Sequence, residues 1–387
     1  MNLTRGMSVT VFVAIGLLAG AVAAEQPALP QPASVPARPA SATPGALFAP
    51  SEADSTQLPP EMAPDFTLPV IAPRDTFQLS EHGSQPVLLF FFDAGDMAST
   101  YAVPYVSEWY RRYLNDGLVI IGIQEPEYPP MMDVRTVLEA TARADAFFPV
   151  AMDSTRSVSA AYAVQGLPAF VVIRPGGKIA LETWEARPYA EVETGIQRVL
   201  AEIKPDIVNP FLVKPLRPTD DPTKRVLAAT PVVMLGCESG TISAFHESEC
   251  DSFCNYKDLG EKIRGLAYLQ GYWKVTPNSA AHEIKFASAD DHLRLIYSGK
   301  GVWLLPGFVS GSPQRIYVKQ DHVYIDKAVW GQDIYGDEVG NPYILMKYPV
   351  PVHVINNRSF GTHELELMPV EGDAAFYYIF FEDGVAE

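Results

Sequence analysis

The sequence predicts an α/β domain followed by a mainly antiparallel β domain. Up to about residue 204, continuous apolar runs of strand length alternate with amphipathic segments of helix length, which is typical of strands buried on both faces of a sheet. From Gly271 onward, apolar and polar residues instead alternate with a period of two. That pattern indicates strands with one core face and one solvated face.

Composition limits the classes of function. The chain has 387 residues and is 48% hydrophobic, so we expect it to fold into two or three domains. Lys and Arg number 29 against 46 Asp and Glu, a formal charge of −17 that disfavours nucleic-acid and anionic-membrane binding. The chain has no Walker loop, G-x-G-x-x-G, G-x-S-x-G or H-E-x-x-H motif, so nucleotide and hydrolase chemistry have no support and no cofactor is predicted.

The first residues have the pattern of a secretory signal. Met1 to Ala24 contains Arg5, an apolar stretch from Val9 to Val22, and small residues at Ala21 and Ala23. We predict cleavage near Ala23 or Ala24, a periplasmic or secreted mature protein and no membrane span after cleavage. The alternative is an uncleaved anchor helix, for which the apolar stretch is short.

Residues 25–60 are rich in proline and alanine. Proline fixes φ and donates no hydrogen bond, and few large apolar residues are available for burial, so we predict an extended linker. A recognition site for a partner that binds polyproline II helices is a second interpretation.

The α/β domain is expected over residues 61–204. The predicted strands are Pro86 to Phe92, Leu118 to Ile123, Ala169 to Ile173 and Lys178 to Glu182, and the predicted helices are Ser99 to Tyr113, Asp133 to Ala144 and Pro188 to Ile203. The aromatic residues spaced by four in the first helix are expected in the core.

Four ordered motifs in this domain carry a family resemblance. They are Ala63 to Pro69 (APDFTLP), Pro86 to Phe92 (PVLLFFF), Phe148-Pro149-Val150 with Asp153, and Tyr162 to Phe170 (YAVQGLPAF). The series resembles the thioredoxin-like superfamily, in particular its peroxiredoxin and periplasmic thiol-disulfide reductase branch. The resemblance implies a thioredoxin-like fold in which Pro168 is the cis-proline that faces the redox site.

The expected redox cysteines are missing. The family carries C-x-x-C, or one peroxidatic cysteine, after the first buried strand, whereas this chain has Asp96 and Ser99 at the two cysteine positions. A carboxylate and a hydroxyl cannot perform thiol-disulfide exchange, because that reaction needs a thiolate. We therefore predict a redox-inactive site in which Asp96 caps the following helix.

Residues 205–230 form a proline-punctuated connector, and the β domain is expected over 271–387. About eight strand-length segments predict a barrel or sandwich. A helix from Asp258 to Leu269 running into Gly271-Tyr272-Trp273 weakly resembles the opening of lipocalin-like barrels. Such a barrel can hold a small apolar ligand, with Trp273 and Trp303 as candidate cavity residues, but a filled core is the simpler interpretation.

Three cysteines lie in the segment 231–270 between the two domains. For an exported protein we predict that Cys237 forms a disulfide with Cys250 or Cys254 and that no metal is bound. The alternative is a metal or redox centre built from Cys237, His246, Cys250 and Cys254, whose spacing matches no standard zinc pattern.

Two functional hypotheses follow from these residues. In the first, the chain is not an enzyme but an exported binding or assembly module, whose partner is an exported protein or a small apolar ligand. In the alternative, it is a thiol-disulfide oxidoreductase or copper-delivery factor that uses Cys250 and Cys254.

Overall fold

The structure is a computed structural model that describes residues 61–184, 187–243, 249–283, 288–308, 314–369 and 373–386. Met1–Ala42 separates as one unit from Thr43–Glu387, and all that follows concerns the second unit. The predictions for the leader and for the linker at residues 25–60 lie outside the described residues, as does His246.

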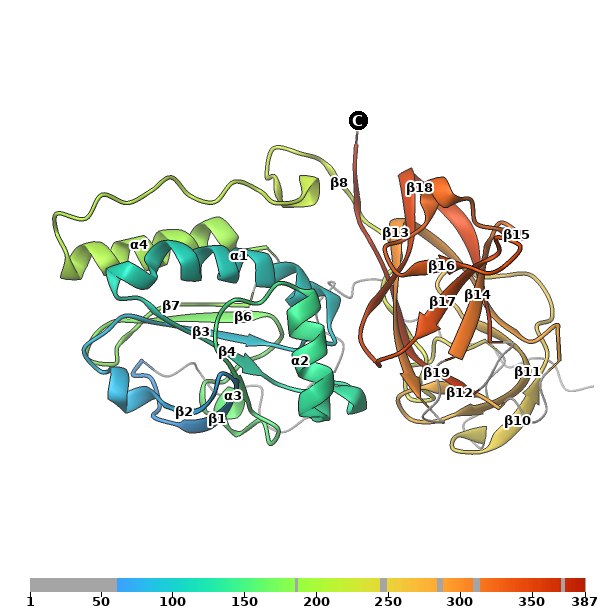
Figure 1. Ribbon diagram of the computed structural model, residues 1–387, viewed down its shortest axis with the longest axis horizontal. Helices are drawn as coiled ribbons and strands as arrows, with labels where there is room; N and C mark the ends of the chain where they lie inside the picture. Colours follow the sequence, from blue (N-terminus) through green and yellow to red (C-terminus); the bar gives the residue numbers. More distant parts are fainter. Residues whose placement is uncertain are drawn as a thin grey trace, which may run out of the picture. The chain divides into compact units, whose positions relative to one another are not determined.

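The first domain is built on a seven-stranded sheet with strand order β2-β1-β5-β4-β3-β6-β7 (Figure 1). Its strands are β1 (Thr67–Ala72), β2 (Arg74–Gln78), β3 (Val87–Phe92), β4 (Val119–Gln124), β5 (Val150–Met152), β6 (Ala169–Ile173) and β7 (Ile179–Thr183). Strands β3, β4 and β5 are parallel, and β6 runs antiparallel to β3. The α-helices are α1 (Met97–Tyr113), α2 (Val134–Arg143), α3 (Ser157–Ala161) and α4 (Tyr189–Ile203), and short 3-10 helices are η1 (Leu79–His82), η2 (Leu114–Asp116) and η3 (Pro129–Met132).

The apolar run of β3 separates two cores. Phe90 and Phe92 pack with α1 and α4 on one face of the sheet, and Leu89 and Phe91 pack in a second cluster with Tyr162 on the other face. This two-sided burial confirms the interpretation of the continuous apolar run. Helices α1 and α2 each begin after an aspartate N-cap. Asp96 accepts a hydrogen bond from the backbone N–H of Ser99, and Asp133 accepts one from the backbone N–H of Thr136.

The second domain contains an eleven-stranded, mainly antiparallel sheet with the main path β10-β11-β12-β19-β13-β18-β14-β17-β16 (Figure 1). Off this path, β15 pairs with β14 and β9 pairs with β19, and β20 forms a small separate sheet with β8. The strands are β8 (Val226–Leu227), β9 (Val233–Met234), β10 (Phe253–Tyr256), β11 (Tyr268–Val275), β12 (Ala280–His282), β13 (His292–Phe308), β14 (Gln314–Gln320), β15 (Val323–Tyr324), β16 (Ile334–Gly336), β17 (Pro342–Met346), β18 (Val352–Met368), β19 (Ala374–Phe381) and β20 (Gly384–Val385), and the 3-10 helices are η4 (Pro218–Asp220) and η7 (Lys327–Val329).

One predicted helix is wrong. Residues 258–267 lead into β11, which begins at Tyr268, and this described stretch contains no helix. Gly260 and Gly265 both adopt positive φ, 82° and 81°, which interrupts any helix there. Gly271-Tyr272-Trp273 therefore lies within a strand instead of after a helix, and the described residues show no lipocalin-like barrel.

The core of the β domain is filled by side chains. Trp273 is fully buried, donates its indole N–H to the Gln270 carbonyl at 2.8 Å and packs against His282 and Phe376. It lines neither of the two hollows described for the chain, which lie on the first domain and the connector. Trp273 is therefore a residue of the packed core, which was the simpler of the two interpretations, and not a residue that lines a cavity.

Candidate functional site

The two positions that would hold a dithiol are occupied by residues that bond to the backbone around them. Asp96 Oδ2 accepts from the backbone N–H of Ser99 at 2.7 Å, and Ser99 Oγ accepts from the backbone N–H of Asp93 at 3.3 Å. Ser99 is fully buried and Asp96 is 9% exposed. Both side chains thus serve the turn that starts α1, and the hydroxyl is not presented to a substrate.

Asp93 is a second acidic residue of this loop, and sequence reasoning missed it. Its two oxygens accept from Gly95 N at 2.9 Å, Gln124 Nε2 at 2.8 Å and Glu127 N at 2.8 Å. These bonds tie the end of β3 to the end of β4. The sequence does contain a sign of this role, because Asp93 directly follows a six-residue apolar strand. A carboxylate at the end of a buried strand is itself buried and needs several hydrogen-bond donors.

Pro168 lies beside the same loop. The Leu167–Pro168 peptide bond is cis, as the resemblance implies. In the antiparallel pairing of β3 with β6, Ala169 is opposite Phe91, so the preceding Pro168 is next to the end of β3. The scaffold around the dithiol positions is therefore retained although the cysteines are not.

The β domain covers this loop through β19. The Tyr378 hydroxyl donates to the carbonyl of Gly95 at 2.6 Å, and Tyr378 is only 2% exposed. Its ring lies 5.1 Å from that of Tyr128, which follows β4. Tyr378 belongs to the same buried cluster as Phe92, Ala94 and Met97, so the space in front of the loop is filled by this chain.

Polar contacts surround this covered loop. Glu382 Oε1 accepts from the Tyr101 hydroxyl at 2.8 Å and from the Trp303 indole N–H at 2.6 Å. Trp303 also stacks on His353, with ring centres 4.4 Å apart. Trp303 therefore holds Glu382, which also accepts from Tyr101 of the first domain, and its candidate role in a ligand cavity has no support here.

Two ion pairs also join the domains. Arg143 of α2 lies 2.6 Å from Asp333 of the β domain, and Arg187, before α4, lies 2.5 Å from Asp383 after β19. Sequence reasoning missed this contact as a whole, because no local pattern specifies which side chains meet across 190 or more residues.

Burial changes the acidity of the covered loop. It raises the pKa of Asp93 to about 7, against the opposing hydrogen bonds from Gly95, Gln124 and Glu127, and it also raises the pKa of Asp96. Burial, reinforced by the neighbouring Asp96 and Asp93, raises the pKa of Glu127 to about 9. The Tyr378 hydroxyl of the β domain donates to the Gly95 carbonyl beside these carboxyls, and Arg156 of the first domain lies 3.1 Å from Glu125.

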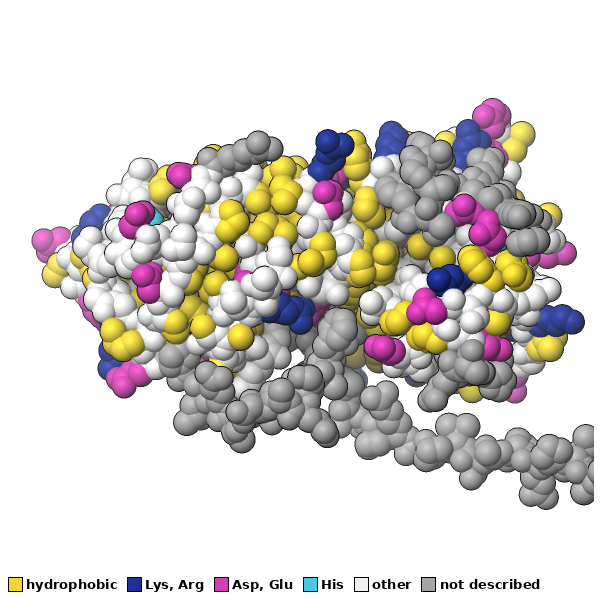
Figure 2. All heavy atoms as spheres, turned by 90° about the horizontal axis from the view of Figure 1, so that it is seen from below, with side chains coloured by type: hydrophobic (Ala, Val, Ile, Leu, Met, Phe, Trp, Pro, Cys, Tyr) yellow, Lys and Arg dark blue, Asp and Glu magenta, His cyan; other side chains and the backbone are white. Residues whose placement is uncertain are grey.

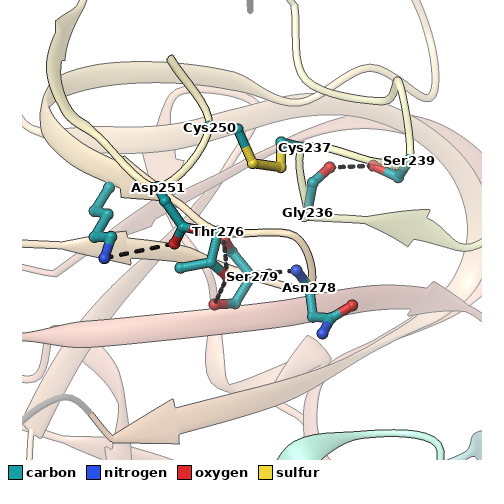
Figure 3. The surroundings of a disulfide bond; sticks show 9 residues. Gly236, Cys237, Ser239, Cys250, Asp251, Thr276, Asn278 and Ser279 are labelled. Atoms are coloured by element: carbon teal, nitrogen blue, oxygen red, sulfur yellow. Dashed lines mark hydrogen bonds and ion pairs between the residues drawn. A yellow bond between two sulfur atoms is a disulfide. The ribbon is translucent and has the colours of Figure 1, made fainter. Parts of the chain in front are cut away.

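The cysteines form a separate site in the β domain. Cys237 is bonded to Cys250, one of the two pairings expected, and Cys254 carries a free thiol (Figure 3). Cys237 N donates to Thr276 O at 2.9 Å, and Asp251 N donates to Val275 O at 2.8 Å, so the end of β11 holds both arms of the bridge. The described residues hold no group of three metal-ligating side chains, and the alternative set with His246 is not tested.

Comparisons with known proteins agree with this geometry. Residues 59–181 match the AhpC/TSA family. The match covers the sheet and the dithiol loop, and it confirms the resemblance to the thioredoxin-like superfamily. The chain thus consists of a thioredoxin-like α/β domain followed by a mainly antiparallel β domain.

Curated and solved proteins show partial similarity to this chain. "Protein DipZ" of Mycobacterium bovis is 26% identical over 226 residues, which is 57% of this chain and 31% of the relative. This chain thus spans about a third of that protein's length. Among solved structures, a putative thiol:disulfide interchange protein DsbE from Chlorobium tepidum is 21% identical, covering 38% of this chain and 99% of that one, with a TM-score of 0.34. A secreted Mycobacterium tuberculosis disulfide oxidoreductase homologous to E. coli DsbE is 19% identical, covering 34% and 95%, with a TM-score of 0.30.

In the part of the chain that the structure describes, none of the helices has the length and apolar character that a membrane crossing requires.

Proposed function

We propose that the chain is an exported, redox-inactive thioredoxin-like protein that acts as a binding or assembly module. The observation that carries the proposal is the pair Asp96 and Ser99 at the dithiol positions, each engaged with the backbone of its own turn. The three cysteines of the chain all lie beyond residue 236, so the thioredoxin-like domain has no thiol for disulfide exchange.

The cover over the dithiol positions supports the proposal that this loop has a structural role and not a catalytic one. In this domain, the surface in front of the dithiol positions meets Tyr378 of β19, and a substrate would have to displace that side chain and its hydrogen bond to Gly95. The partner of the module, an exported protein in this proposal, therefore binds to another surface. A small apolar ligand is less favoured, because Trp273 and its neighbours fill the β domain core.

Export rests on two observations. Met1 to Ala24 has the pattern of a secretory signal, and a disulfide between Cys237 and Cys250 suits an oxidising compartment. One of the structural relatives is described as secreted.

An insulin-reduction assay with dithiothreitol tests the proposal. We expect the mature chain to add nothing to the background rate, and Cys250→Ser to change nothing. The double variant Asp96→Cys, Ser99→Cys is the matched control, because it restores sulfur at the scaffold positions. Turnover by the unmodified chain that Cys250→Ser abolishes would overturn the proposal.

A second candidate function uses the cysteines of the β domain. Cys254 is a partly exposed thiol four residues from a disulfide, so its thiolate is within chain reach of the bridge. In that case the chain is a thiol-disulfide oxidoreductase or a copper-delivery factor. Native mass spectrometry with and without reductant distinguishes the two, since one bound copper per chain or a mixed disulfide at Cys254 favours the second candidate.

A further inference from the structure

A part of the connector lies as an extended segment against the helices of the first domain. Figure 1 shows the chain after α4 as a long trace beside α4 and α1 that ends at η4. Pro210 and Pro215 fix φ in this segment and bias the residues before them, Asn209 and Lys214, toward an extended conformation. The segment therefore turns one edge of its backbone to the helices and the other edge away from them.

The backbone edge that faces the helices is held by hydrogen bonds. Arg112 Nη1 of α1 donates to the carbonyl of Phe211 at 2.7 Å. The backbone N–H of Val213 donates to the buried carboxyl of Glu193 of α4 at 2.6 Å, and that of Leu216 donates to the Tyr105 hydroxyl at 2.7 Å. These contacts with buried or partly buried groups fix the position of the segment.

The other backbone edge of the segment has no such partners. In an extended chain, the N–H and C=O groups of successive residues point to opposite edges. Phe211 and Val213 use the edge toward the helices, so the groups of Leu212 and Lys214 point the other way. Within the described ranges, the structure gives no hydrogen bond to the backbone of either residue. Two donors and two acceptors are thus exposed as at the edge of a sheet.

Apolar side chains border this free edge. Phe211 is 98% exposed and Phe147 is 59% exposed, and Leu212 and Leu216 are exposed as well. A hollow of about 720 Å³ lies between them, and we refer to it as the connector groove, bounded by residues 104–112 of α1, Asp145, Phe147 and residues 211–216. Large apolar side chains gathered on the surface around a groove indicate a site of interaction.

The connector groove also offers a cation. Its charged residues are Arg111, Arg112 and Lys214 against Glu108 and Asp145, an excess of one positive charge in a chain of net charge −17. Glu108 lies 2.6 Å from Arg111 and 2.8 Å from Arg112, whereas Lys214 has no ion-pair partner among the described residues. On the face that Figure 2 presents, acidic and basic side chains are interspersed. The groove therefore favours an occupant with a carboxylate that can reach Lys214.

The free backbone edge and the apolar border together specify an extended peptide as the occupant. A small apolar ligand or a helix could contact Phe211 and Phe147, but neither would pair with the backbone groups of Leu212 and Lys214. In strand addition, main-chain hydrogen bonds supply affinity, and alternate side chains supply specificity. Residues 211–216 span about 20 Å when extended, which is the length of a strand of about six residues.

We propose that the connector groove binds an extended segment of a second exported protein, which adds as a strand along Leu212 and Lys214. Apolar side chains of that segment pack on Phe211 and Phe147, and an acidic side chain pairs with Lys214. The proposal rests on the function proposed above, because it names the surface through which the binding module holds its partner.

A phage-displayed library of random twelve-residue peptides, selected on the full mature chain, tests the proposal. We expect the enriched peptides to alternate apolar and polar residues and to contain Asp or Glu. Fluorescence anisotropy with a labelled enriched peptide should show binding about tenfold weaker for Phe211→Ser, whose fold is checked by circular dichroism. A selection that enriches no peptide, or peptides that bind Phe211→Ser equally well, would overturn the proposal.

Two further variants test how the peptide is held. Leu212→Pro and Leu212→Ala both remove the leucine side chain, but only proline removes the backbone N–H, so Leu212→Pro should bind about fivefold more weakly than Leu212→Ala. Lys214→Glu should weaken binding about tenfold, and a peptide with Lys in place of its acidic residue should restore it. Equal binding by the two Leu212 variants, or a loss at Lys214→Glu that the changed peptide does not restore, would overturn the proposal.

A control variant and a second assay separate this proposal from other causes. Leu259→Ser removes a leucine of the β domain that is 73% exposed, and it should leave peptide binding unchanged. If the insulin assay shows no turnover and the groove variants do not affect peptide binding, this inference alone fails. If the chain reduces insulin while the groove variants weaken peptide binding, the redox-inactive function fails and the groove remains a peptide site.

Discussion

The molecule contains two groups of buried carboxyls whose pKa values shift in opposite directions. Around the dithiol positions, burial raises the pKa of Asp93, Asp96 and Glu127. In the β domain, the pKa of Asp258 is lowered although burial opposes the shift, because Lys262, His292 and Arg294 contact it. The pKa of Glu366 is lowered in the same way by Arg294 and Lys319, 2.7 and 3.2 Å away.

The difference lies in what surrounds each group of carboxyls. In the β domain, carboxylates are stabilised by cations that the same sheet supplies. In the thioredoxin-like domain, Asp93 accepts from the backbone N–H groups of Gly95 and Glu127, and Tyr378 of the second domain donates to the neighbouring Gly95 carbonyl. The carboxyls of the β domain therefore stabilise that domain from within. The carboxyls around the dithiol positions instead make the contact between the domains sensitive to protonation.

Removing the cation that holds the β domain group should have the largest effect. Arg294→Met leaves Asp258 and Glu366, both buried, without their shared guanidinium. We expect a loss of about 3 to 5 kcal/mol, measured by urea unfolding at pH 7. The exposed Lys224→Met is the control and should change stability little. A loss below about 1 kcal/mol for Arg294→Met would show that the network is not the source of stability.

Removing the disulfide should have the next largest effect. Cys237→Ser opens the loop between residues 237 and 250, and closing a loop of this size is worth roughly 3 kcal/mol in the chain-entropy model. Thermal unfolding should therefore shift to lower temperature, whereas Cys254→Ser should have little effect. Peptide mapping without reductant should find Cys237 linked to Cys250 and Cys254 free. Three free thiols in the exported protein would refute the pairing.

Glu127→Gln should change how stability depends on pH. The folded pKa is about 9, above the ordinary value of 4.5, so the folded chain keeps a proton that the unfolded chain loses. Glu127 therefore makes stability fall as pH rises from about 4.5 to 9. The variant should show a shallower fall, by about 1 to 2 kcal/mol between pH 5 and 8, since Asp93 and Asp96 share the protonation.

The control for this prediction is the exposed Glu81→Gln, which should leave the pH profile unchanged. Chemical denaturation at several pH values supplies the measurement. Parallel profiles for the unmodified chain and Glu127→Gln would show that Glu127 is ionised in the folded protein, and the contrast between the two carboxyl groups would then rest on Asp93 and Asp96 alone.

Tyr378→Phe should have the smallest effect. The change keeps the packing of the ring and removes the 2.6 Å hydrogen bond to Gly95 O, at a cost of about 1 kcal/mol. Hydrogen exchange of residues 93–99 should become faster, because the cover over the loop opens more often. Tyr377→Phe on the same strand is the control. If both variants exchange alike, the Tyr378 hydroxyl does not hold the loop closed.

Local patterns were enough to predict strands β3, β4, β6 and β7 and helices α1, α2 and α4 of the first domain, whereas β1 and β2 were not predicted. The apolar runs that became β3 and β6 and the Asp caps of α1 and α2 are encoded within a few residues each. The short β5 and α3 escaped prediction, because three and five residues give no measurable periodicity. The prediction of a helix at 258–269 was wrong. It rested on the helical spacing of the apolar residues, whereas Gly260 and Gly265 adopt positive φ, which a helix does not allow.

The candidate site was predicted in part. The replacement of cysteines by Asp96 and Ser99 and the position of Pro168 follow from aligned motifs. Asp93 directly follows β3, but the sequence does not show that it bonds to Gln124 and Glu127, which lie 31 and 34 residues away. Tyr378, which covers the loop, lies 283 residues from Gly95 in the chain. Contacts between residues so far apart carry no local signature, and they decide both what covers the loop and how its acids titrate.

The long separation between Gly95 and Tyr378 also has a consequence for the order in which the protein is made. At roughly 5 to 20 residues per second, about 15 to 60 s pass between synthesis of the loop and synthesis of the strand that covers it. The small sheet of β8 and β20 likewise joins the connector to residues 384 and 385. The Tyr378 cover over the loop can therefore form only after nearly the whole chain has been made, so the loop and its cover cannot fold as one local unit.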